Sequence, residues 1–82
     1  MRSLTSPVLE LVSLNKDILR LSCEFHRRAA EMTPDARLER ALQIIGKFNE
    51  LTALDEQAGH VVSGETYLGL SGELGRLARY LS

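Results

Sequence analysis

The sequence predicts an all-α fold: an antiparallel hairpin of two long helices, followed by a shorter C-terminal helix. Three observations predict it. Apolar residues recur every three or four positions over most of the chain, which is the period of a helix that buries one face. A hydroxyl residue stands directly before a proline at two places, a pair typical of helix starts. The composition, 44% hydrophobic and 26% charged, is that of a folded chain, and we expect one domain, residues 1–82.

The first helix is expected to run from Pro7 to Ala30. The hydroxyl of Ser6 would cap it, and Pro7 lacks the N–H that stays unpaired in a first turn. Apolar residues recur every seven positions, and a second series follows three positions later, which gives a seam of about three heptads. The seam consists of Leu4, Leu11, Leu14, Ile18, Leu21, Phe25 and Met32.

The second helix is expected to run from Pro34 to Ala58. Thr33 is its predicted cap, and Asp35 places a negative charge near the positive end of the helix dipole. Gly59 suits the left-handed position that commonly ends a helix. The main apolar stripe comprises Leu38, Ala41, Leu42, Ile45 and Phe48, and Ile44, Leu51, Leu54 and Ala58 widen it.

The last third of the chain predicts a weaker helix. Residues 60–66 show no helical period, so we expect a loop there, with a small β-hairpin turning at Ser63-Gly64 as the alternative. Three glycines weaken the helical pattern, and a helix start at Ser71 is therefore a second interpretation. Whether residues 60–70 form loop, hairpin or helix stays open. The apolar stripe of this helix is Tyr67, Leu70, Leu74, Leu77 and Leu81.

The size of the chain favours a second subunit. A core this small supplies on the order of 3–5 kcal/mol of net stability, and the single cysteine, Cys23, excludes an internal disulfide. Each long helix also carries a wider apolar face than one neighbour covers. We therefore expect a homodimer that forms a helical bundle. The predicted dimer or partner interface is Leu11, Leu14, Ile18, Leu21, Phe25, Tyr67, Leu70, Leu74, Leu77 and Leu81.

Charge and hydropathy point away from nucleic acid and membrane. The net charge is −1, from ten basic and eleven acidic residues, so no polyanion partner is expected. No apolar run approaches the length of a membrane span. Glu10 interrupts the apolar N-terminal stretch, which argues against a signal peptide. We expect a cytoplasmic protein, and the lone Cys23 agrees with a reducing compartment.

One stretch, GHVVSGET at residues 59–66, resembles the phosphate-binding loop G-x-x-x-x-G-K-[ST]. The lysine of that motif is replaced by Glu65, which puts a negative charge where phosphate needs a positive one. The preceding segment also reads as a helix, whereas phosphate loops follow a strand. We therefore interpret the stretch as a plain loop.

Two further groups of residues are weighed against chemistry. Cys23 and His26 share a helix face, but a structural zinc site needs four ligands and a catalytic pair needs a third group. We expect no metal, cofactor or catalytic site, and read the pair as a half-buried thiol beside a surface imidazole. Arginines gather near the first interhelical turn, where neighbouring acids offset them. They are Arg27, Arg28, Arg37 and Arg40, with Glu24, Glu31, Asp35 and Glu39.

The function expected from these patterns is a protein that acts through protein–protein contacts, as an adaptor, chaperone or anti-activator, and not an enzyme. Its partners would be a second copy of itself and an unidentified protein. The alternative is a small dimeric DNA-binding transcriptional regulator, for which binding to duplex DNA should be salt-sensitive. A third hypothesis is an enzyme or metal carrier that uses Cys23 and His26.

Overall fold

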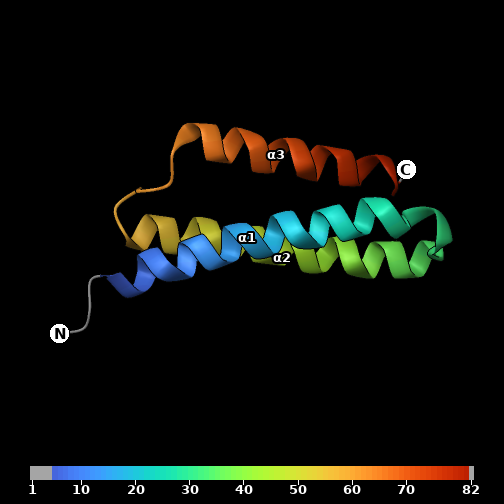
Figure 1. Cartoon of the computed structure of the whole chain (residues 1–82), viewed down its shortest axis with the longest axis horizontal. Coiled ribbons are helices and arrows are strands. Elements are labelled where there is room, and N and C mark those ends of the chain that lie inside the picture. Colours follow the sequence, from blue (N-terminus) through green and yellow to red (C-terminus); the bar gives the residue numbers. More distant parts are fainter. Residues whose placement is uncertain (1–4, 82) are drawn as a thin grey trace.

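The computed structural model describes residues 5–81, with side chains from residue 8 onward, and this part of the chain is all-helical. Figure 1 shows two long helices side by side as an antiparallel hairpin, with the third helix lying along the first and running in the same direction. No strand occurs within residues 5–81, and no helix there combines the length and apolar content that a bilayer crossing requires. The elements are α1 (Thr5–Arg28), the 3-10 turn η1 (Ala29–Glu31), α2 (Pro34–Gln57) and α3 (Gly64–Arg79).

Both ends of α1 differ from the prediction. The helix already includes Thr5, so Ser6 lies inside its first turn and the prediction that Ser6 is the cap is wrong. Leu4 of the predicted seam lies outside the described residues. At the other end, α1 stops at Arg28 and the backbone tightens into η1 before the turn. Thr33 is extended, with φ −70° and ψ 160°, because the proline that follows it disfavours helical backbone.

The two ends of α2 confirm the predictions made from Thr33, Pro34 and Gly59. Thr33 Oγ1 accepts a hydrogen bond from the backbone N–H of Ala36 at 3.1 Å, and Pro34 occupies the first turn. Ala58 is the C-terminal cap, one residue beyond Gln57. Gly59 follows with φ 89°, which is the left-handed conformation expected of it.

The start of α3 corrects the prediction of a loop or hairpin through residue 66. The helix begins at Gly64, upstream of both expected starts. Ser63 caps it, because its Oγ accepts from the backbone N–H of Thr66 at 3.1 Å. Glu65 then lies in the first turn, where the helix dipole favours a negative charge. The stretch that resembles a phosphate loop is therefore a connection followed by a capped helix start.

The core lies where α1 meets the other two helices. α1 packs along the whole of α2, and α3 packs mainly on α1 and contacts α2 much less. The molecule is only 22 × 17 Å across, so this core is thin. Its buried apolar residues are Leu11, Leu14, Ile18, Phe25, Ala29, Ala41, Ile44, Leu51, Leu70 and Leu77.

The stripe predicted for α2 is wrong on one side. Leu38 and Leu42 are 48% and 57% exposed, whereas Ile44 and Leu51 are fully buried. The reason is that α3 leaves most of α2 uncovered, so only the side of α2 that faces α1 is shielded from solvent.

Candidate functional site

Most of the predicted interface residues pack inside the chain's own core. Leu81, at 40%, is the one that is clearly exposed, and Leu21, Tyr67 and Leu74 are half-buried. The remaining six are at most 9% exposed: Leu11, Leu14, Ile18, Phe25, Leu70 and Leu77.

A strip of apolar side chains remains uncovered on α1. Val8, Val12 and Leu19 are 43%, 49% and 44% exposed and follow one another at intervals of four and seven residues, so they share one side of the helix. We call these three residues the α1 strip. Val8 and Val12 of the strip line a groove of about 310 Å³ between α1 and the connection before α3, whereas Leu19 lines a different pocket. The other lining residues of the groove are Leu11, Asn15, Leu51, Val61, Val62, Ser63 and Thr66.

The groove contains a polar atom without a partner. Asn15 Oδ1 is shielded from solvent, and no donor within the described residues hydrogen-bonds to it. Asn15 follows Val12 by three positions and precedes Leu19 by four, so it belongs to the same side of the helix as the α1 strip. A buried acceptor without a hydrogen bond is costly, which makes this position a place where a donor would be favourable.

Asp55 joins the end of α2 to the chain that follows. The carboxylate is 2% exposed; Oδ1 accepts from the backbone N–H of Val62 at 2.8 Å, and Oδ2 accepts from the Tyr67 hydroxyl at 2.6 Å. His60 Nδ1 lies 3.8 Å from Oδ2. The hydrogen bond from Tyr67, followed by that from Val62, lowers the pKa of Asp55. Burial, and then Asp55 itself, raises the pKa of Tyr67 to about 12.

Glu73 joins α3 to α1. Its Oε1 accepts from the hydroxyl of Ser22, which is fully buried, at 2.7 Å, and its Oε2 accepts from Arg76 at 3.2 Å. His26 Nε2 lies 3.4 Å from Oε1 without forming a hydrogen bond. The hydrogen bond from Ser22 is the main reason that the pKa of Glu73 is lowered, and the charge of Arg76 adds to it.

Ser22, His26 and Glu73 are the residue types of a hydrolytic triad, but their arrangement is different. In a triad the histidine takes the proton of the serine and the carboxylate orients the histidine. Here the Ser22 hydroxyl donates to Glu73, so the carboxylate lies between serine and histidine. The buried Ser22 has no access to a substrate. The cluster therefore holds two helices together.

Sequence reasoning missed both carboxylate contacts, although a signal for them was present. Ser22 follows the core residue Ile18 by four positions, and Asp55 follows Leu51 by four. A polar residue in the phase of a buried apolar stripe has to find a partner inside the protein. Which partner it finds is decided by the packing of α3, which the sequence pattern does not specify.

Cys23 and His26 both line a pocket between α1 and α3, together with Glu73. Their exposure is the reverse of the sequence prediction of a half-buried thiol beside a surface imidazole. Cys23 is exposed, whereas the imidazole of His26 is 17% exposed and lies against Glu73. The ring of Tyr80 lies near the imidazole at a tilt of 45°, with ring centroids 5.6 Å apart. Within residues 5–81, no group of three or more His, Cys, Asp or Glu side chains is arranged to hold a metal ion.

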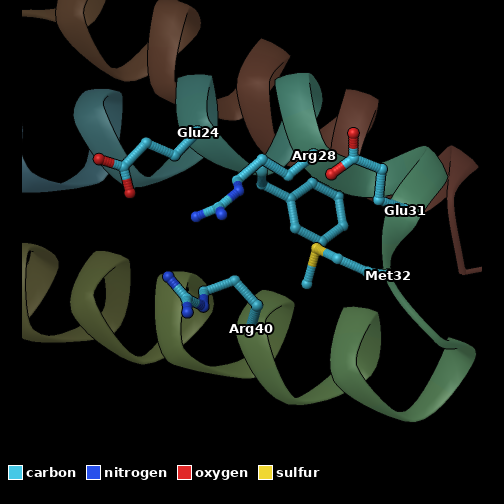
Figure 2. A pocket seen from close by; sticks show the side chains of 6 residues that line it. Glu24, Arg28, Glu31, Met32 and Arg40 are labelled. Atoms are coloured by element: carbon cyan, nitrogen blue, oxygen red, sulfur yellow. The ribbon is translucent and has the colours of Figure 1, made fainter.

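A second pocket opens at the closed end of the hairpin, between α1 and α2 (Figure 2). It has a volume of about 230 Å³. The sequence predicts that neighbouring acids offset the arginines near the interhelical turn, but Arg37 has a backbone partner instead. Arg37 Nε donates to the backbone oxygen of Ala29 at 2.8 Å. The lining residues are Glu24, Phe25, Arg28, Glu31, Met32 and Arg40.

Comparison of the chain with models of known families, with curated proteins and with solved structures finds no match. Any proposal about function therefore depends on the surfaces described above.

Proposed function

We propose that this protein acts by binding protein surfaces, as an adaptor, chaperone or anti-activator type of regulator, and that its first partner is a second copy of itself. The observation that carries the proposal is the α1 strip, which stays exposed after the chain has completed its own core. Apolar side chains gathered beside a groove are typical of an interaction site. A protein of this kind needs no chemistry of its own, and the cytoplasm suits its exposed thiol, Cys23.

The spacing of the α1 strip supports a helix-to-helix contact between two copies. Val12, Asn15 and Leu19 follow intervals of three and four, which is the spacing of side chains at a coiled-coil seam. An asparagine at a seam position fixes the register of paired helices by hydrogen bonding. Asn15 occupies such a position, and its side chain would have to turn outward for the shielded Oδ1 to accept a hydrogen bond from the second copy. The dimer proposed here therefore uses the α1 strip, because the heptad seam predicted from sequence packs inside the chain.

Sedimentation velocity tests the dimer. We expect the protein to sediment as a dimer at about 10 µM, a range typical of modest protein affinities, and Val12→Lys to sediment as a monomer with unchanged helical circular dichroism. Ser13→Lys is the matched control, because Ser13 is exposed on α1 next to the strip and should leave the dimer intact. A wild-type monomer at that concentration, or a dimer that persists in Val12→Lys, would contradict the proposal.

Binding of other proteins is tested with the same pair of variants. Tagged wild type, Val12→Lys and Ser13→Lys are used as baits in parallel, and the recovered proteins are identified by mass spectrometry. We expect at least one protein that is recovered with wild type and Ser13→Lys and lost with Val12→Lys. The recovery of one identical set with all three baits would argue against a role of the α1 strip in partner binding.

A further inference from the structure

The pocket at the closed end of the hairpin combines an apolar floor with two cations. Phe25 is 2% exposed and Met32 is half-buried, and together they form the floor. Arg28 comes from the last turn of α1 and Arg40 from the second turn of α2. Figure 2 shows the guanidinium groups of Arg28 and Arg40 directed toward the same gap between the two helices, with the Met32 side chain nearer the turn.

Neither guanidinium group has an anionic partner within the part of the chain that the structure describes. The carboxylate of Glu24 lies 3.7 Å from Arg20 instead. Figure 2 shows the carboxylate of Glu31 at the end of α1 near the turn, apart from the gap that holds both guanidinium groups. Arg40 is also half-buried, so its charge loses part of its hydration. A cation that is partly removed from water without a counter-charge is unfavourable, and an anion from outside the chain would relieve that cost.

We propose that this pocket binds a carboxylate group carried on an apolar body. A guanidinium group donates two parallel N–H bonds to a carboxylate, so Arg28 and Arg40 would hold its two oxygens from opposite walls. The apolar body would lie on Phe25 and Met32, and sulfur and aromatic edges pack well against such groups. The volume of about 230 Å³ lies below that of pockets for drug-sized ligands, which points to a small group.

The glutamates in the lining decide the charge of the ligand. Glu24 and Glu31 also line the pocket and would repel a second negative charge, so the pocket suits a single negative charge better than a phosphate dianion. Two sources supply this chemistry: a free aromatic acid, or the C-terminal carboxylate of a protein that ends in an apolar residue. The proposal does not depend on whether the chain dimerises, because the α1 strip lies on another side of α1.

The test is a titration followed by proton–nitrogen NMR on the full chain. The probes are benzoate for the free acid and N-acetylphenylalanine for a protein C-terminus, with benzamide and N-acetylphenylalanine amide as neutral counterparts. We expect one or both acids to shift the amide signals of Phe25, Met32 and Arg40 with a dissociation constant of about 1 mM, and the neutral compounds to bind about tenfold more weakly. Phenyl phosphate should bind more weakly than benzoate.

Variants separate a built site from general attraction to a charged surface. Arg40→Gln and Arg28→Gln should each weaken binding of the better acid about tenfold. Arg27→Gln removes the same charge from the next position on α1, outside the pocket, and should leave binding unchanged. If Arg40→Gln fails to fold, the exposed Arg28 carries the test. No shift with either acid at about 10 mM, equal binding of acids and amides, or an equal loss in Arg27→Gln would overturn the proposal.

Discussion

Replacing Gly72 by alanine should stabilise the protein by about 1 kcal/mol. Gly72 lies in the middle of α3 on its exposed face, and a Cβ added there would meet no heavy atom within 4 Å. Glycine loses more backbone freedom than alanine when a helix forms, and this difference gives the expected gain. For a chain of this size the gain corresponds to a rise of about 4–8 °C in the melting temperature.

The stabilisation from glycine-to-alanine substitutions should be additive at exposed positions of α3. Gly69 and Gly75 are also exposed in α3, and a Cβ at either position again meets nothing within 4 Å. The triple variant Gly69→Ala, Gly72→Ala, Gly75→Ala should therefore gain roughly 2–3 kcal/mol. That gain is a large fraction of the net stability of a chain this small, which is on the order of 3–5 kcal/mol.

Urea unfolding followed by circular dichroism at the helical band measures the gain, and Gly59→Ala provides a control of opposite sign. Gly59 has φ 89°, a left-handed conformation in which a side chain clashes with the backbone, so alanine there should cost about 1 kcal/mol. If Gly72→Ala destabilised the protein, residue 72 would not lie on an exposed helical face and the position of α3 would be wrong. If Gly59→Ala stabilised it, the left-handed conformation of residue 59 would be wrong.

Two further predictions concern pH and capping. The pKa values of Asp55 and Glu73 are lowered in the folded state, so their contribution to stability is present above the unfolded values of 3.8 and 4.5 and is lost as pH falls below them. In an acid titration followed by proton–nitrogen NMR, the amide signals of α3 should be lost first. Tyr67 has the opposite sign: its raised pKa of about 12 gives stability below the unfolded value of 10.0 that disappears as pH rises toward 12, and ultraviolet absorbance of the ionised phenol should report this late titration. Thr33→Ala should cost about 1 kcal/mol in urea unfolding because Ala36 N–H loses its acceptor, whereas Thr33→Ser should cost far less.

The sequence by itself determined the three helices and both ends of α2. Thr33 and Gly59 act at the positions that their chemistry predicts, because a cap is a hydrogen bond or a backbone angle within a few residues of the chain. The cap of α3, Ser63, was not predicted, although it also depends only on a residue three positions away. The hairpin alternative places Ser63 in a turn, whereas the hydrogen bond that its Oγ accepts from the Thr66 N–H makes it a helix start.

Only the tertiary structure decided which apolar faces are covered. The periodicity of α2 does not distinguish the exposed Leu42 from the buried Ile44, because both lie in a wide apolar stripe and the choice depends on where α1 and α3 lie. The same holds for Asp55, whose partners Val62 and Tyr67 arrive with the chain that follows α2. Helix formation depends on bonds between near neighbours in the sequence, whereas burial depends on contacts between residues far apart in it.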